Sequence, residues 1–98
     1  MVRCATCERE FDRRGQDPPA ASIAVEIAGD EYIESFFFCD KCGVYTQETY
    51  CDQFLGEDTV HVSGPIARET GDRLVELIRR CPDPMNKKCT CDSHREFW

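Results

Sequence analysis

Two stretches of alternating apolar and polar residues lie in the first half of the chain. Residues 22–28 place isoleucine, valine and isoleucine at every second position, and residues 32–39 continue the alternation into three consecutive phenylalanines. A period of two residues predicts half-buried β-strands. Gly29 and Asp30 separate the two stretches and favour a turn, so we expect a β-hairpin.

Two further strands and the start of a helix are expected next. Residues 44–54 are rich in valine, tyrosine and threonine and read as a third strand, and residues 59–63 are expected to form a short fourth strand. Gly64 and Pro65 follow. Because proline suits the first position of a helix, we expect them to open one.

The apolar face of this helix is predicted from four residues at the spacing i, i+3, i+4 and i+7. These residues are Leu74, Leu77, Ile78 and Cys81. Pro82 and Pro84 should end the helix, because a residue that precedes proline is displaced from helical geometry. The tail, residues 85–98, is expected to be loop-like.

These elements predict an α+β fold with a small antiparallel sheet of three or four strands, one C-terminal helix and a cysteine-rich tail. A chain of 98 residues has the length of one small domain, residues 1–98. Its core is modest at this size. We therefore expect a further source of stability.

Cysteine is the unusual feature of the composition, with eight residues among 98. A small, cysteine-dense chain is usually cross-linked by disulfides or by metal. The N-terminus lacks the apolar run of a secretory signal, and no segment reaches the ~18 consecutive apolar residues that span a bilayer. We therefore expect a cytoplasmic protein, in which close cysteine pairs bind metal.

Two cysteine pairs share the spacing C-x2-C, "CATC" at residues 4–7 and "CDKC" at residues 39–42. Two intervening residues allow a tight turn to direct both sulfurs to one point, and two such turns supply four thiolates ~2.3 Å from a zinc ion. The predicted hairpin spans most of the interval between the pairs. Gly43 allows the positive φ that turns backbone N–H groups toward sulfur. The candidate ligands are Cys4, Cys7, Cys39 and Cys42.

Residues 1–52 resemble the zinc-ribbon and rubredoxin-like families, on the motifs "CATC" and "CDKCGVY". These families build a metal site from two cysteine turns around a small antiparallel sheet. The resemblance implies two zinc knuckles with the four cysteines as ligands of zinc, or of iron in a rubredoxin-like protein. The first turn departs from the pattern, because Glu8 and Arg9 stand where many such turns have a glycine.

Residues 64–98, the helix and the tail, contain a second candidate site. Its proposed ligands are Cys81, Cys89, Cys91 and His94. Cys51 is the alternative to His94 and would give four cysteines. A short loop costs less to close, which favours the local set, whereas a cysteine in the third strand can face the helix. Cys51 and Cys81 can equally be small apolar core residues, and His61 is expected to be a surface or core histidine.

The formal net charge is −7, which is a poor match for nucleic acid. The basic residues that cluster late in the chain are Arg79, Arg80, Lys87, Lys88 and Arg95, and we interpret them as a solvated helix end and loop. The chain carries neither a phosphate-binding glycine loop nor a G-x-S-x-G motif. An enzyme is therefore not the favoured interpretation.

We expect a small zinc-binding protein with one or two structural Zn²⁺ ions that contacts another protein, as an interaction or regulatory module. The contact surface is expected on the aromatic face of the sheet or on the tail. A rubredoxin-like iron electron carrier and a thiol redox or metal-transfer protein are the alternatives.

Overall fold

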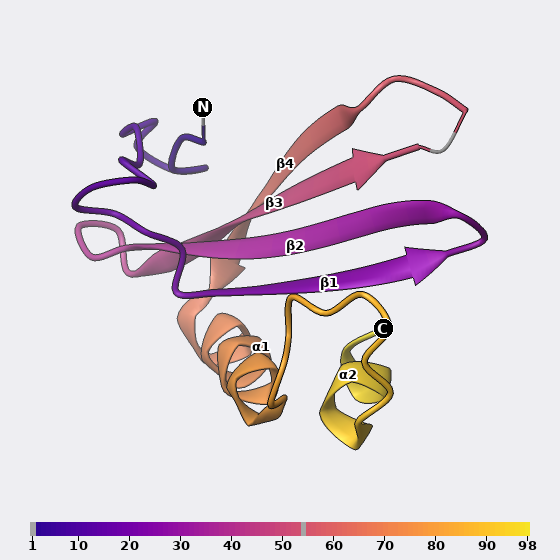
Figure 1. The fold of residues 1–98 in the computed structure, drawn as a ribbon. Coiled ribbons are helices and arrows are strands. Elements are labelled where there is room, and N and C mark those ends of the chain that lie inside the picture. Colours follow the sequence, from indigo (N-terminus) through magenta and orange to yellow (C-terminus); the bar gives the residue numbers. More distant parts are fainter. Residues whose placement is uncertain (1, 54) are drawn as a thin grey trace.

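The computed structural model describes residues 2–53 and 55–98. It contains one four-stranded antiparallel sheet in the order β1-β2-β3-β4, and two helices (Figure 1). The elements are β1 (Ala21–Ile27), β2 (Asp30–Cys39), β3 (Val44–Asp52), β4 (Thr59–Ala67), α1 (Arg68–Arg80) and α2 (Asp92–Phe97). The expected α+β fold with an antiparallel sheet is confirmed. Phe54, the expected last residue of the third strand, lies outside the described residues.

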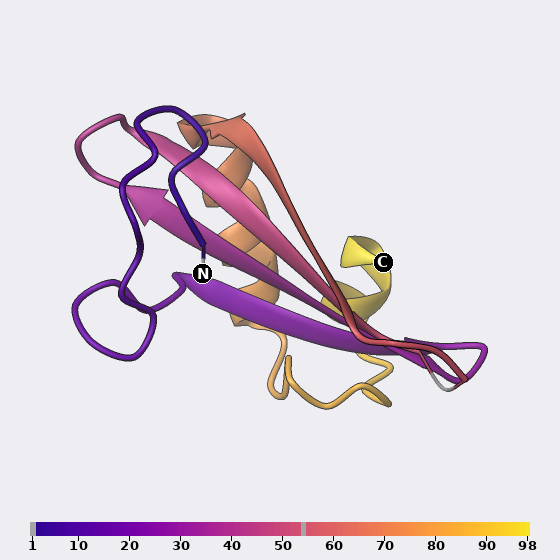
Figure 2. The same ribbon diagram turned by 90° about the horizontal axis from the view of Figure 1, so that it is seen from above.

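Two apolar clusters lie on opposite faces of the sheet. The helices cover one face and the N-terminal segment covers the other (Figure 2). The helix-side cluster consists of Ile23, Phe36, Tyr45, Val75 and Ile78. The N-terminal cluster consists of Val2, Cys4, Phe11, Phe37 and Cys39. Phe36 and Phe37 are both 0% exposed, so the expectation that the aromatic sheet face contacts a partner is wrong for these two rings.

The turn between β1 and β2 lies one residue earlier than expected. Ile27 pairs with Asp30, and the two residues between them, Ala28 and Gly29, have φ angles of 52° and 90°. Two consecutive positive φ angles are characteristic of the two-residue hairpin turns whose twist matches that of the strands. The prediction of a turn at Gly29-Asp30 missed Ala28, because alanine seldom adopts positive φ.

The prediction that Gly64 and Pro65 open the helix is wrong. Both residues belong to β4, and α1 begins at Arg68. Strand β4 is at an edge of the sheet, and its register with β3 shifts between Tyr45 and Gln47. A proline, which has no N–H to donate, is tolerated at such an irregular edge.

Helix α1 turns Gly71, Val75 and Ile78 toward the sheet. The predicted apolar face is correct at Ile78 and at the buried Cys81, but Val75 takes the buried position instead of Leu77, which is half-buried. The packing of the helix against the sheet therefore decides which of these apolar side chains is buried.

The tail is more ordered than expected. Helix α1 ends at Arg80, before Pro82, as predicted. The six-residue helix α2 then occupies part of the expected loop, and the ring of Phe97 meets that of Phe36 edge-on, with centroids 6.0 Å apart. No helix among residues 2–53 and 55–98 is long and apolar enough to cross a membrane.

Gly71 marks a close approach of α1 to the sheet. A Cβ atom there would lie 2.1 Å from Cδ2 of Tyr45, a buried ring whose hydroxyl donates to Asp72 at 2.6 Å. We expect Gly71→Ala to lower the free energy of unfolding by about 1–3 kcal/mol through overpacking, although alanine favours helix by about 1 kcal/mol. Thermal denaturation measures the change, with the exposed Thr70→Ala as control. A melting temperature at or above that of the parent protein would contradict this packing.

Candidate metal centres

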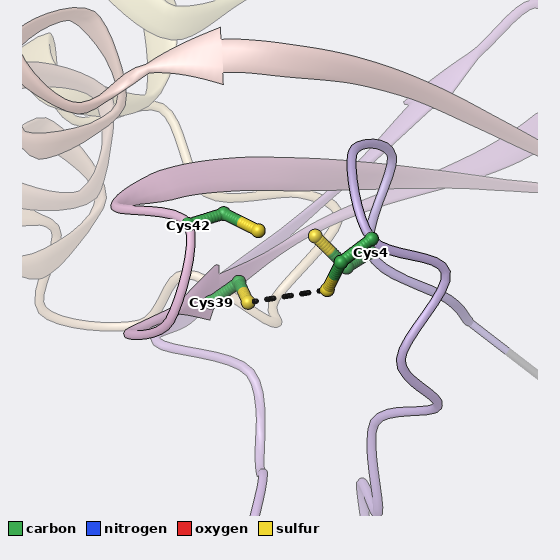
Figure 3. Close-up of side chains that lie close together, drawn as sticks. Cys4, Cys39 and Cys42 are labelled. Carbon is green, nitrogen blue, oxygen red and sulfur yellow. Dashed lines mark hydrogen bonds between the residues drawn. The ribbon is translucent and has the colours of Figure 1, made fainter.

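The first candidate centre brings together the two C-x2-C pairs. The sulfur atoms of Cys4, Cys7, Cys39 and Cys42 all lie within 4.8 Å of one another. The Cys7 and Cys39 sulfurs are 3.9 Å apart, close to the ~3.8 Å edge of a tetrahedron of thiolates around zinc. Figure 3 shows the side chains of Cys39 and Cys42 directed from their turn toward Cys4. These cysteines are free thiols, placed so that they can hold a metal ion.

The two turns have matching backbone geometry. In the second turn, the N–H of Gly43 donates to the carbonyl of Cys39 at 2.7 Å, and in the first turn the N–H of Glu8 donates to the carbonyl of Cys4 at 2.9 Å. The two donors are each four positions after the first cysteine of the pair, and their φ angles are 69° for Gly43 and 63° for Glu8. The left-handed position that glycine usually fills is therefore occupied by Glu8, at a cost of about 1–2 kcal/mol.

The thiols of this cluster differ widely in acidity. Burial opposes the ionisation of Cys39, but the N–H of Cys42 and the guanidinium of Arg9 outweigh it and lower the pKa of Cys39 to about 6. The pKa of Cys42 is raised to about 12, chiefly by its hydrogen bond with Cys7. Four thiolates at this spacing repel one another, so a bound cation would remove the electrostatic cost of ionising all four.

Arg9 is a site residue that the sequence analysis did not identify. Its pKa is raised first by the hydrogen bond to Cys39, and its guanidinium is held 3.2 Å from Asp17 and 5.0 Å from the centre of the Phe11 ring. A fixed N–H donor beside a thiolate orients the ligand and offsets its charge. The feature of the sequence that could have indicated this role is the position of Arg9, two residues after Cys7.

The second candidate centre consists of Cys81, Cys89, Cys91 and His94, whose donor atoms also lie within 4.8 Å of one another. The sulfur of Cys81 is 3.5 Å from that of Cys89 and 3.3 Å from that of Cys91. It is 3.4 Å from Nδ1 of His94. Tetrahedral zinc would set these edges near ~3.8 Å for two sulfurs and ~3.5 Å for sulfur and nitrogen.

His94 is held in the orientation of a metal ligand. The residue is 2% exposed, and Nε2 of its ring lies 2.6 Å from the carbonyl oxygen of Ala24. Because a carbonyl only accepts, Nε2 carries the hydrogen, and the lone pair is on Nδ1, which faces Cys81. Histidines that bind metal usually donate their second N–H in this way.

The pKa values of two thiols of the second centre, Cys81 and Cys91, are shifted in opposite directions. The pKa of Cys81 is raised to about 11, mainly by burial. The pKa of Cys91 is lowered by the backbone N–H of His94, which also caps α2 by donating to the Cys91 sulfur at 3.4 Å. The cap and the centre therefore depend on the same two residues.

The tail that carries this centre covers the free edge of β1. The N–H of Ala24 donates to the carbonyl of Pro84 at 2.8 Å, and the carbonyl of Ala24 accepts from His94. Lys87 adds ion pairs with Glu26, at 3.9 Å, and with Glu31. A covered edge cannot pair with another strand, so the tail seals this side of the sheet.

The other candidate donors lie outside both centres. Cys51 belongs to β3, is 8% exposed and pairs with Tyr32 across the strands. His94, and not Cys51, is grouped with the three tail cysteines. His61 is exposed on β4. Cys51 therefore has the position of a small core residue.

Comparisons of the chain with protein families, with characterised proteins and with solved structures gave no match. The zinc-ribbon resemblance is therefore confined to the two cysteine turns. The geometry of the donor atoms alone identifies two clusters that are compatible with a metal-binding module.

Proposed function

We propose that the chain is a small zinc-binding protein in which both zinc ions are structural, and that it acts as a protein-interaction or regulatory module. The observation that carries this proposal is that each cluster supplies four protein donors. A catalytic zinc needs an open position for water or substrate, whereas sets of four cysteines, or of three cysteines and one histidine, are typical of structural zinc.

The places that the two clusters connect also support a structural role. The first joins the N-terminal loop to the β2–β3 turn, with Cys7 and Cys39 separated by 32 positions. The second joins the end of α1 to the tail through Cys81 and His94. Metal at such places substitutes for the core that a chain of this size lacks.

Thiol redox chemistry is less well supported. A reactive thiolate must be accessible as well as acidic. Cys39, whose pKa is lowered to about 6, is 0% exposed. Iron stays an alternative for the first cluster, because four thiolates bind either metal.

A protein partner is favoured over nucleic acid by the surface. Exposed apolar side chains lie near both hairpin ends of the sheet, with Ile27 and Val60 on opposite faces. Ile27, Leu55 and Val60 are 51%, 93% and 59% exposed. Among the basic residues, Arg80 is paired with Glu76 at 2.8 Å. Apolar contacts of this kind favour a protein surface.

The metal content tests this proposal. Protein purified without added metal is expected to contain two equivalents of zinc per chain by elemental analysis and no visible absorption band. Cys91→Ser should retain one equivalent. Iron with visible absorption would favour the electron carrier, and protein that is folded without metal would refute the structural role. Salt-dependent retention on DNA would contradict the choice of partner.

A further inference from the structure

The two edges of the sheet differ. The order β1-β2-β3-β4 places β1 and β4 at the edges. Figure 2 shows that the tail lies beside β1, whereas β4 forms the opposite border of the sheet. The tail bonds to both backbone groups of Ala24 in β1. No strand or tail segment pairs with the outer side of β4 within residues 2–53 and 55–98.

The register identifies which backbone groups of β4 point outward. Ala24 directs its N–H and C=O away from β2, and it pairs through Ile33 and Tyr50 with Val60. Residues opposite one another alternate between hydrogen-bonded and non-bonded pairs in antiparallel sheets. Carried across the sheet, this alternation directs the N–H and C=O of Val60, and of Val62 two residues later, to the open side.

The composition of β4 does not protect this edge. Charged residues make up 32% of the chain, yet the strand, TVHVSGPIA, contains none. Edge strands are usually blunted by charge, proline or a covering segment. Gly64 and Pro65 blunt the end near α1 and leave residues 59–63 open, with Val60 and Val62 exposed by 59% and 40%.

The open stretch is nearly palindromic. Thr59-Val60-His61-Val62-Ser63 reads almost the same in both directions about His61, and a two-fold interface must be self-complementary. We propose that β4 pairs antiparallel with β4 of a second copy of this chain, with the two-fold axis at His61. Val60 then lies opposite Val62 of the second copy, and the outward backbone groups of both residues form four hydrogen bonds across the interface.

The side chains at this interface fit the pairing. Val60 and Val62 lie opposite Tyr50 and Glu48 of β3, so the four valines of the dimer form one apolar row. The carboxylate of Glu48 is buried and neutralised by Arg13 at 3.1 Å. The two His61 side chains emerge on the other face. The interface goes beyond the proposed function and does not depend on which metal is bound.

The mass of the metal-loaded protein in solution tests the dimer. Sedimentation equilibrium should give a weight-average mass about 1.5 times the 11.3 kDa chain mass at ~1 mM, the concentration at which an association worth about 4 kcal/mol is half complete, and the mass should rise toward twice that of the chain at higher concentration. Val62→Lys should give a monomer that retains its metal. Ile27→Lys, at a site 51% exposed in β1, should remain a dimer. A monomeric parent protein, or a dimeric Val62→Lys, would overturn the proposal.

Cross-linking tests the register. Antiparallel non-bonded partners have Cα atoms about 4.5 Å apart, within the range of a disulfide. His61→Cys is therefore expected to form an intermolecular disulfide between the two introduced cysteines, identified by peptide mass spectrometry. Ser63→Cys should not link to itself, because four residues of strand place the two Cα atoms roughly 14 Å apart. A link in Ser63→Cys, or none in His61→Cys, would refute this pairing.

Discussion

Cys39→Ser is expected to leave the protein unfolded near room temperature. Cys39 is 0% exposed, ends β2 and belongs both to the first candidate metal centre and to the N-terminal apolar cluster. Structural zinc contributes on the order of 10 kcal/mol or more to folding, and the whole stability of a small protein is typically about 5–15 kcal/mol. Loss of one ligand therefore removes a share of stability comparable to the total.

The N-terminal segment has few other attachments that would compensate. Phe11 stacks on Phe37 with ring centroids 5.3 Å apart, and the N–H of Ala5 donates to Oγ1 of Thr46 at 2.9 Å. Two of the five buried members of its cluster are themselves cysteines of the centre. Without metal, the apolar contacts that remain in this cluster are those of Val2, Phe11, Phe37 and Val44.

Circular dichroism during heating and elemental analysis measure the effect of Cys39→Ser. Cys51→Ser is the matched control, because it makes the same substitution at a buried thiol outside both clusters. The control should keep both metal equivalents and lose about 1 kcal/mol of stability. An unchanged thermal transition in Cys39→Ser would contradict the proposed role of the first centre, and a lost metal equivalent in Cys51→Ser would make Cys51 a ligand.

The strands were predictable because alternation is a local signal. Residues 22–28 and 32–39 carry the period of two wherever they pack, and β1 and β2 lie within two residues of these predictions. The helix assignment failed at Pro65, because proline suits both a first helical position and an irregular sheet edge. Only the pairing of β4 with β3, which is a tertiary contact and not a local pattern, distinguishes these two roles of Pro65.

The composition of the candidate centres was predictable to different extents. C-x2-C spacing is local, so the first set of four thiols could be named from sequence alone. The choice between His94 and Cys51 depends on where β3 lies relative to the tail. No local sequence pattern indicates this spatial relation. Helix α2, with six residues, is too short to be stable alone, so its formation depends on contacts of Cys91, His94 and Phe97 that only the folded chain makes.

His94→Ala is expected to detach the tail while the sheet and α1 stay folded. The substitution removes one ligand of the second centre and the hydrogen bond to the Ala24 carbonyl. When the metal is lost, the tail also loses its link to Cys81. The helix-side cluster of Ile23, Phe36, Tyr45, Val75 and Ile78 contains no residue of this centre. One metal equivalent should be lost, with only a modest fall in melting temperature.

Amide hydrogen exchange at Ala24 reports directly on the tail, because this N–H donates to the carbonyl of Pro84. We expect its exchange in His94→Ala to be at least ~10-fold faster, the equivalent of about 1.4 kcal/mol. His61→Ala, which replaces the only other histidine in the sequence, should keep both metals and the protection of Ala24. If Ala24 stayed protected in His94→Ala, the Lys87 ion pairs and Phe97 would be sufficient to hold the tail, and the second centre would have another role.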